Sequence, residues 1–482
     1  MNRRLIVRLQ GATLMLEAVL MLPALFVSLY YRDGTAAAFA KSAGILLVLG
    51  FPLWFFAKPS GRNLHAREGL VSVAISWILL SLFGALPYLF SGVIPRVMDA
   101  IFESASGFTT TGATVLGILE IQPRGILFWR SFTLWIGGMG VLVLTLALLP
   151  QMTGRTSFLM RAESPGPGLS KLVPKMGDMA KLLYLMYVVL TVLQALALLM
   201  AGMTPFDAML HALGTAGTGG FSNYTANVGH FQNPWVEGIT FAFMALFGVN
   251  FAMFYRALKG SWREVFRSEE LRWYAAILLA ATLAITLFLL PTYQSLGTSL
   301  RHSAFQVASM ASTTGYTTAN IGQWHQGARM ILLLLMFIGA CGGSTAGGLK
   351  VVRLATLIKA ARGEAQHAFR PRKVQVLRME GKAVDDSVVS QTLVFFFLYT
   401  GFILLGTFAL SLENLFSFED NLTAALAGVS NGGVVFSASA VVHDFAAYGW
   451  FSKLTLVFLM LLGRLEIFPV LVLFHPSLWR RS

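Results

Sequence analysis

Ten apolar segments, each long enough to cross a lipid bilayer, dominate this chain of 482 residues. A transmembrane helix needs about 20 apolar residues to cross roughly 30 Å of hydrocarbon. The composition agrees, because only 12% of the residues are charged, whereas an ordinary soluble domain has about a quarter. We therefore predict an all-α polytopic membrane protein. Its ten expected spans are 9–31, 36–57, 69–90, 125–150, 181–202, 235–258, 271–290, 328–361, 388–410 and 451–474.

Two sequence features bear on how the fold is held and on how the chain starts. The single cysteine, Cys341, excludes an internal disulfide, so helix packing in lipid must hold the fold together. The first apolar segment follows a basic start but lacks a convincing small-residue cleavage site. We expect this segment to be kept as a span rather than removed as a signal peptide.

A glycine-centred phrase occurs four times, each time between the two members of a pair of apolar segments. The copies are Thr110-Thr111-Gly112-Ala113-Thr114, Gly217-Thr218-Gly219-Gly220-Phe221, Thr313-Thr314-Gly315-Tyr316-Thr317 and, more loosely, Ser430-Asn431-Gly432-Gly433-Val434. This recurrence predicts a two-helix preface followed by four helix–pore loop–helix repeats around one central pore. We assign the preface to residues 1–65 and the repeats to 66–155, 156–262, 263–382 and 383–482.

A short helix is expected before each phrase. Large apolar residues lie ten positions before Gly112, Gly219, Gly315 and Gly432; they are Phe102, Met209, Phe305 and Leu422. The intervening segments allow about three helical turns, which is too short for a span and suits a re-entrant pore helix. Residues that can cap free N–H groups open these helices. They are Asp99, Asp207, Asp420 and, in the third copy, Ser303.

The positive charges indicate the orientation in the membrane. Most of the 36 Lys and Arg residues fall in the N-terminal segment, the C-terminal segment and every second loop. The positive-inside rule makes that side cytoplasmic, together with both termini, and leaves all four phrases opening from the external side. The net charge of +14 therefore needs no nucleic-acid partner. Topology and anionic lipid headgroups explain it, and a docking surface for a cytoplasmic partner is the alternative.

Four further motifs accompany the phrases: Trp135-Ile136-Gly137-Gly138-Met139-Gly140, Arg161-Ala162-Glu163-Ser164-Pro165-Gly166-Pro167, Gly342-Gly343-Ser344-Thr345-Ala346-Gly347-Gly348 and Gly463-Arg464-Leu465-Glu466. Together these residues resemble the Trk/Ktr/HKT superfamily of cation transporters, most closely the TrkH-type membrane subunits of Trk potassium uptake systems. The resemblance covers nearly the whole chain. It implies potassium uptake across the bacterial inner membrane by a homodimer. It also implies a cytoplasmic ring of TrkA-like regulatory subunits that bind nucleotide, so the chain itself needs no cofactor.

The phrases supply the chemistry of a cation filter. A potassium ion that enters a narrow pore must exchange its water shell for oxygens, and backbone carbonyls provide these without a fixed charge that would trap the ion. The alternative is that the small residues only let helices pack closely. Potassium is expected to bind only at the filter residues, which are Thr110, Thr111, Gly112, Ala113, Gly217, Thr218, Gly219, Gly220, Thr313, Thr314, Gly315, Tyr316, Ser430, Asn431, Gly432 and Gly433.

The selectivity expected of this filter is limited. No copy contains the full Thr-Val-Gly-Tyr-Gly phrase of potassium channels, and the fourth copy departs furthest from the others. In the superfamily that the chain resembles, a serine in place of the first-loop glycine accompanies sodium preference. Gly112 therefore favours potassium.

The eighth apolar segment is interrupted by ten residues that include five glycines, 339–348. Unwound backbone at membrane depth is tolerated where it is buried or lines a cavity, so we expect an intramembrane loop below the filter. By resemblance this loop is the gate; the alternative is a kinked packing helix. The expected gate residues are Gly342, Gly343, Ser344, Thr345, Ala346, Gly347, Gly348 and Arg464.

Arg464 is expected near the centre of the last span, where an arginine costs about 2.5–3.5 kcal/mol on insertion scales. It either snorkels to the interface or faces the pore below the filter, where its charge opposes cation passage. Glu466 lies on another side of the same helix and is a poor intrahelical partner. The sequence leaves the partners of Glu17 and Arg130 open.

Two rival functions differ in class. A symporter that couples potassium to sodium or protons would use midplane ionisable residues, which are scarce here. An intramembrane enzyme would need paired catalytic groups in facing spans, and the sequence offers none. Channel-like, gated permeation is the favoured prediction, and the chain is not expected to be an enzyme.

Overall fold

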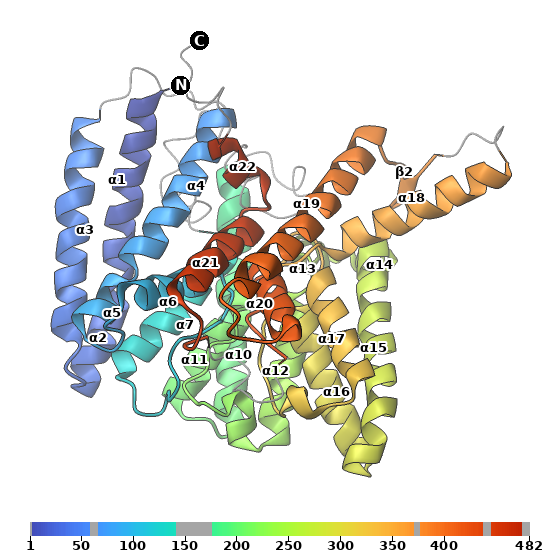
Figure 1. Ribbon diagram of the computed structural model, residues 1–482, viewed down its shortest axis with the longest axis horizontal. Coiled ribbons are helices and arrows are strands. Elements are labelled where there is room, and N and C mark those ends of the chain that lie inside the picture. The colour runs from blue at the N-terminus through green and yellow to red at the C-terminus, as the bar shows by residue number, and fades with distance from the viewer. Residues whose placement is uncertain (1, 58–65, 141–175, 371–375, 437–444, 475–482) are drawn as a thin grey trace.

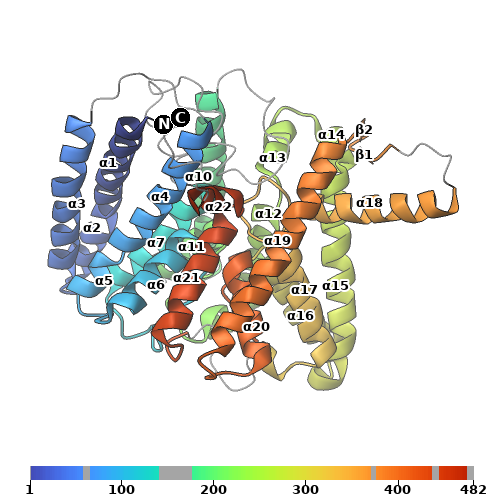
Figure 2. The same cartoon turned by 45° about the horizontal axis from the view of Figure 1, so that its top comes forward.

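The computed structural model describes residues 2–57, 66–140, 176–370, 376–436 and 445–474. The predicted all-α architecture is confirmed, because the only strands described are two short ones in a single hairpin. Of the expected motifs, 161–167 lies outside the described residues. Figures 1 and 2 show a bundle of long helices with shorter helices at its centre and one helix that projects sideways.

The helices are assigned to the predicted preface and the four predicted units by their place in the chain. The preface contains α1 (Arg3–Leu20), α2 (Leu22–Tyr31) and α3 (Ala36–Phe56). The first unit contains α4 (Ala66–Phe83), α5 (Leu86–Phe90), α6 (Val97–Phe108) and α7 (Arg124–Met139). The second contains α10 (Met176–Met200), α11 (Pro205–Gly217), η3 (Asn227–Phe231), α12 (Pro234–Phe247), α13 (Phe251–Leu258) and α14 (Trp262–Arg267).

The third unit contains α15 (Glu269–Tyr293), α16 (Leu296–Ala311), η4 (Ile321–Gln323), α17 (Gln326–Ile338) and α18 (Val351–Phe369). A hairpin of β1 (Arg378–Met379) and β2 (Lys382–Ala383) follows α18, which is the projecting helix of Figure 1. The fourth unit contains α19 (Asp386–Ser411), α20 (Phe418–Ser430), α21 (Trp450–Arg464) and α22 (Phe468–Phe474).

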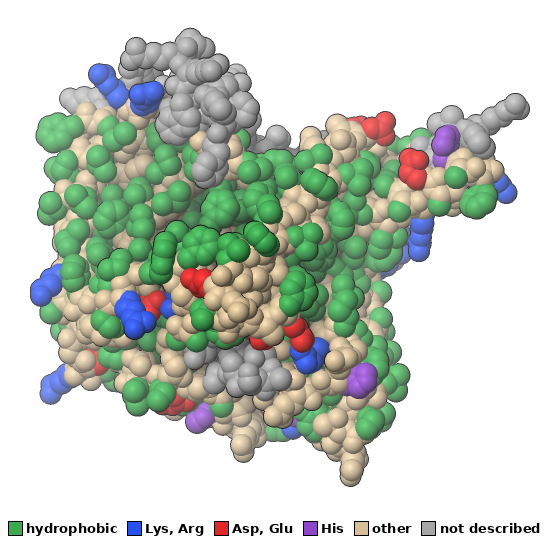
Figure 3. Space-filling view, in the orientation of Figure 1, with side chains coloured by type: hydrophobic (Ala, Val, Ile, Leu, Met, Phe, Trp, Pro, Cys, Tyr) green, Lys and Arg blue, Asp and Glu red, His purple; other side chains and the backbone are tan. Residues whose placement is uncertain are grey.

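Six helical segments of the described chain are long and apolar enough to cross a membrane, or seven if the bent pair α12 and α13 counts as one. Hydrophobic side chains cover much of the face shown in Figure 3, as expected of a surface in contact with lipid. Exposed leucines continue along α15 at helical spacing; they are Leu279, Leu283 and Leu287.

The expectation of unbroken second spans at 235–258 and 451–474 is wrong. The chain bends by 94° between α12 and α13, where Gly248 ends the first helix and the Asn250 side chain caps the second by accepting from the Ala252 amide at 2.9 Å. The other span breaks after Arg464, because Glu466 and Ile467 adopt positive φ of 53° and 67°. The segment that follows the phrase is therefore interrupted, rather than one continuous helix, in the second, third and fourth units.

The preface packs through small residues. A Cβ on Gly11 of α1 would overlap the backbone of α3 at Gly50 and Trp54, so the two helices approach closely, as small residues allow in lipid. Asp33, between α2 and α3, binds the Gly125 amide at the start of α7 at 2.6 Å. Although burial opposes it, hydrogen bonds from Ser28, Gly125 and Thr35 lower the pKa of Asp33. This contact ties the preface to the first unit.

Candidate ion pathway

All four phrases adopt the same backbone turn. A residue with left-handed φ of 58°, 55°, 55° or 55° is followed two positions later by a glycine with φ of 80°, 67°, 81° or 59°. The first set is Thr110, Thr218, Thr313 and Asn431, and the second is Gly112, Gly220, Gly315 and Gly433. Glycine is the residue that adopts positive φ without a steric cost. The recurrence of one turn at four sites supports the repeat prediction.

The predicted alignment of the second and fourth copies is wrong by one position. Gly220 and Gly433, rather than Gly219 and Gly432, match Gly112 in conformation. The residues ten positions earlier are then Phe102, Leu210, Phe305 and Thr423, all of which are buried. Met209 and Leu422, the expected anchors, are only partly buried. The second and fourth copies each contain two adjacent glycines, so the sequence allows either glycine to match Gly112. The residues ten positions before the two glycines do not show which match is correct.

Each phrase comes directly after a short helix, and the same backbone hydrogen bond joins the phrase to the end of that helix. The amide of the residue before each matched glycine donates to a carbonyl five residues earlier, at 2.8 to 3.1 Å. These donors are Thr111, Gly219, Thr314 and Gly432, and the helices are α6, α11, α16 and α20. Two predicted filter residues, Gly217 and Ser430, are the last residues of their helices. The negative end of each helix dipole therefore lies next to a phrase, which favours a cation there.

The four phrases form a closed ring of backbone, which we call the glycine ring. A Cβ on Gly112 would overlap the carbonyl oxygen of Gly219, and one on Gly220 would overlap that of Thr314. Likewise, a Cβ on Gly315 would contact the carbonyl oxygen of Gly432, and one on Gly433 would overlap that of Thr111. Each unit thus lies against the next, and the fourth lies against the first. Side chains are excluded from these four positions, so a serine at residue 112 would force the ring to shift.

Polar side chains support the ring from behind. The Asn431 amide donates to the Thr111 hydroxyl at 3.2 Å and to the Met460 carbonyl at 2.9 Å. The hydroxyls of Ser312 and Thr314 lie 2.7 Å apart. The sequence analysis counted Asn431 among the filter residues, and the structure brings its side chain to the junction of the fourth and first units.

The Tyr316 side chain is buried and bridges two units. Its hydroxyl lies 3.2 Å from the His211 carbonyl and 3.3 Å from the Phe221 carbonyl, and Gly214 leaves room for it. We expect Tyr316→Phe to destabilise the fold by about 1 kcal/mol, because buried carbonyls lose their donor. Thermal unfolding of the purified protein would measure the loss. A variant with unchanged stability would show that the hydroxyl contributes nothing there, and Tyr30→Phe, at an exposed position, is the control.

In three of the units, a polar side chain of the pore helix also binds the chain that follows the glycine. Glu103, His211 and Gln306 lie at matched positions of their pore helices. The Glu103 carboxylate accepts from the Val115 amide at 2.9 Å, and the His211 ring lies 3.1 Å from the Ser222 hydroxyl. Gln306, in the amide orientation that satisfies both its groups, donates to the Tyr316 carbonyl and accepts from the Thr318 amide. The fourth unit has Ala424 at this position, so its phrase lacks this polar contact.

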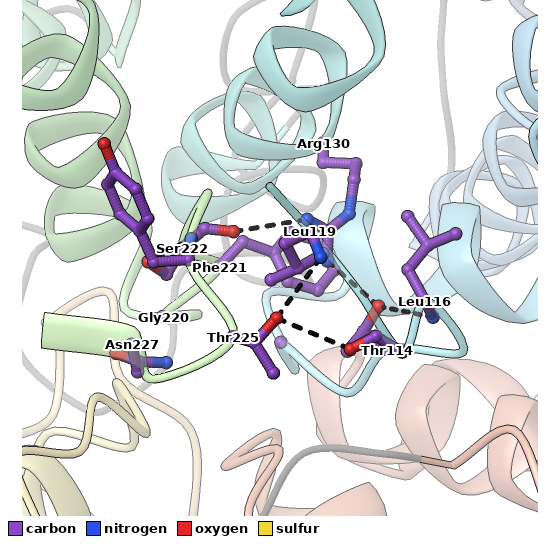
Figure 4. A pocket seen from close by; sticks show the side chains of 12 residues that line it. Thr114, Leu116, Leu119, Arg130, Gly220, Phe221, Ser222, Thr225 and Asn227 are labelled. Atoms are coloured by element: carbon purple, nitrogen blue, oxygen red, sulfur yellow. Dashed lines mark hydrogen bonds between the residues drawn. The ribbon is translucent and has the colours of Figure 1, made fainter. Parts of the chain in front are cut away.

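Arg130, whose role the sequence left open, joins the first two units. It is 1% exposed and binds Glu103 at 2.6 Å, the Thr114 hydroxyl at 3.0 Å and the Ser222 carbonyl at 3.3 Å. Its guanidinium also lies over the Phe221 ring at 4.2 Å. Figure 4 shows Arg130, Thr114, Phe221 and Ser222 around a small pocket that Gly220 also lines. The Arg130–Glu103 pair thus lies within the first unit, and Arg130 reaches the second unit through Ser222 and Phe221.

The units are joined again at the outer ends of the pore helices. Lys453 of α21 binds Asp99 of α6 at 2.6 Å, and Glu237 of α12 pairs with Arg301 of α16 at 3.3 Å. Arg329 of α17 pairs with Glu419 of α20, and Arg124 of α7 lies over Phe206 of α11. In all four junctions the second helix of one unit contacts the pore helix of the next unit. These four contacts, which we call the junction pairs, close a second ring.

The capping prediction is corrected in detail. Thr204 and Ser417 cap α11 and α20, and each accepts from the amide of the expected acidic residue three positions on, Asp207 or Asp420. In the third unit α16 begins at Leu296, capped by Ser295, so the prediction of Ser303 as the cap is wrong. Ser303 instead donates to the Ser299 carbonyl inside the helix.

The glycine-rich interruption forms a compact loop between α17 and α18, which we call the gate loop (residues 339–350). It returns to its own start, since the Lys350 amide donates to the Ile338 carbonyl at 2.7 Å. The Gly347 amide donates to the Thr313 hydroxyl at 2.8 Å, and a Cβ on Gly347 would overlap the Ser430 carbonyl. The loop therefore touches the third and fourth phrases directly. Gly342, Gly343, Ser344, Thr345, Ala346 and Gly348 all belong to it.

Arg464 lies at the C-terminus of α21, not in mid-helix as expected. Its guanidinium donates to the Thr345 carbonyl of the gate loop at 3.0 Å and to the Gly137 and Gly138 carbonyls at 2.5 and 2.6 Å. A cation is stabilised at a helix C-terminus and by such acceptors, so the insertion cost argued for an intact helix does not apply. Glu466, beyond the break, pairs with Arg353 of α18 at 2.7 Å.

A ring of four glycine loops at the C-termini of four short helices, inside a bundle of apolar helices, defines a membrane cation transport protein. The chain belongs to the TrkH family of cation transport proteins, which it matches over residues 36–481. The predicted resemblance is thereby confirmed, and so is the prediction that the chain is not an enzyme.

Proteins similar to this chain are known from several bacteria. It is 37% identical over 488 residues to the Trk system potassium uptake protein TrkH of Salmonella typhimurium, and 33% identical over 483 residues to TrkG of Escherichia coli. These alignments cover 100% and 99% of both chains, respectively. The crystal structure of the potassium transporter TrkH from Vibrio parahaemolyticus superposes with a TM-score of 0.89 at 33% identity, with 100% of both chains covered.

Proposed function

We propose that this protein takes up potassium across the inner membrane of a bacterium by passive, gated permeation through the glycine ring. The closure of the ring supports this proposal most directly, because four backbone segments surround one axis and exclude side chains from it. Carbonyl oxygens in such a ring replace the water shell of the ion. The relatives named as potassium uptake proteins make potassium the ion to test first.

The finer architecture belongs to the same proposal. We propose ten spans with both termini in the cytoplasm and the four phrases at an external entrance, because the positive charges cluster in the termini and in every second loop. The relatives are parts of a Trk system, which fits a complex of several components. We propose a homodimer whose cytoplasmic face meets a TrkA-like ring of nucleotide-binding regulatory subunits. The gate loop and Arg464 then control passage below the filter.

Flux into liposomes tests this function. The purified chain is reconstituted with potassium, sodium or rubidium inside, and tracer uptake and reversal potential are measured with and without gradients of sodium and protons. Passive permeation predicts uptake driven by the potassium gradient alone. Uptake that requires a sodium or proton gradient would instead establish a coupled symporter. Empty liposomes and protein with Gly433→Ala serve as controls.

Arg464→Ala is expected to raise basal potassium flux about tenfold, because the variant removes a positive charge and the bonds that hold Thr345 of the gate loop. The measurement is tracer uptake in the absence of any partner protein. Arg272→Ala, which removes an exposed arginine of α15, is the matched control. A basal flux equal to that of the unmodified protein would remove Arg464 from gating.

A further inference from the structure

A buried carboxylate of α15 is a second ionisable side chain that holds the gate loop, besides Arg464. Glu270 is 8% exposed, and its carboxylate accepts the Gly342 amide at 2.6 Å. The two residues are 72 positions apart, so the bond fixes the loop to the rigid first helix of the unit. A buried backbone N–H that loses its acceptor carries a desolvation cost, so this bond opposes movement of the loop. Neither composition nor resemblance drew attention to Glu270.

The remaining attachments of the gate loop are to backbone or to uncharged groups, apart from Arg464 and the loop's own Lys350. The Cys341 amide donates to the Gly248 carbonyl at 3.0 Å, and the Phe251 amide donates to the Gly343 carbonyl at 3.1 Å. These bonds join the loop to the break between α12 and α13. Within the described chain, Glu270 is therefore the acidic side chain that bonds this loop.

The hairpin that follows α18 binds the first residues of α15. Glu380, at the tip of that hairpin, accepts from the Ser268 hydroxyl at 2.9 Å and from the amides of Glu269 and Glu270 at 2.8 and 3.4 Å. An acceptor at a helix N-terminus satisfies N–H groups that have no partner inside the helix. The Glu380 carboxylate thus caps the helix turn that carries Glu270.

The hairpin is fixed to the projecting helix α18 as well. Lys359 of α18 donates to the Arg378 carbonyl of β1 at 2.8 Å and pairs with Glu269 of α15. The α18 helix, the hairpin and the start of α15 therefore move together or must break charged contacts. Since α18 begins directly after the gate loop, the loop is joined to these elements twice: covalently through α18 and by the Glu270 bond of α15.

We propose that Glu270 is a positioning residue that latches the gate loop in the conformation described, and that Glu380 in the hairpin sets the position of this latch. A displacement of the hairpin is then transmitted through the first turn of α15 to Gly342. The proposal adds a point of regulation to the proposed function and rests on it only in calling the loop a gate.

The single cysteine offers a direct measurement of the latch. Cys341 is 1% exposed and precedes Gly342, so a thiol reagent reaches it only when the loop opens. We expect Glu270→Ala and Glu380→Ala to increase the labelling rate of the full-length protein by a small methanethiosulfonate reagent about tenfold, because the first variant removes the bond to the Gly342 amide and the second removes the cap that positions it. Glu270→Gln, which keeps an acceptor oxygen, should give a smaller increase. Glu364→Ala on exposed α18 is the matched control, and Cys341→Ser sets the background.

Tracer flux of the same variants separates the latch from the function. Faster labelling with raised basal flux supports both proposals. Faster labelling with unchanged flux supports the latch and overturns the role of the loop as a gate. Labelling within twofold of the unmodified protein in Glu270→Gln, Glu270→Ala and Glu380→Ala overturns the latch, whatever the flux. If Glu270→Ala does not fold, Glu270→Gln and Glu380→Ala give the same test.

Discussion

Replacement of Gly433 by alanine is expected to reduce potassium flux about a hundredfold or more. A Cβ at this position would overlap the carbonyl oxygen of Thr111, and the backbone φ of 59° is itself unfavourable for alanine. The loop must therefore move, and it carries the contact that closes the ring between the fourth and first units. A shift worth a few kcal/mol in the barrier already changes a rate by this factor. Tracer uptake into liposomes measures it.

Gly401→Ala is the matched control for this prediction. Gly401 lies in α19 of the same unit, where an added Cβ meets no atom within 4 Å. Its flux should equal that of the unmodified protein. If Gly433→Ala conducts normally while retaining its fold, the ring described here is not the path of the ion.

Replacement of Arg130 by methionine is expected to destabilise the protein by about 3–5 kcal/mol, because the Glu103 carboxylate is left buried without its counter-ion. The measurement is thermal or denaturant unfolding in detergent. The double variant Arg130→Met/Glu103→Gln should recover part of this loss, since no charge then remains in the site. Equal stability of the single variant and the unmodified protein would show that this buried pair contributes nothing to the stability of the fold.

Much of the architecture could be predicted because it depends on features that are local in sequence. Apolar length identifies helices that need lipid, and glycine at a fixed place after a short helix identifies the loops. The gate loop was found for the same reason, since five glycines inside one apolar segment contradict a continuous helix. The fourth phrase, although the loosest in sequence, has the same backbone turn as the others.

The remaining features depend on contacts between residues far apart in the chain. The register at Gly219 and Gly220 is decided by the carbonyl of the neighbouring unit, which no local pattern reports. The break after Gly248 was missed because one glycine and Asn250 lie within a strongly apolar segment. Glu270 could have been noticed as an acidic residue at the edge of a span, but only the folded loop shows what it binds. The insertion cost expected for Arg464 also depended on an unknown helix break, because α21 ends at this residue and is not continuous through it.

The junction pairs also encode the order in which the four units assemble. The four phrases share one backbone turn, yet each junction uses different chemistry: Lys453 with Asp99, Glu237 with Arg301, Arg329 with Glu419, and Arg124 with Phe206. Lys453 placed against Arg301 would bring two like charges together at a partly buried site, and Glu237 against Glu419 would do the same with opposite sign. These like-charge contacts disfavour other orders of the units around the ring, so four units with the same turn assemble in one order.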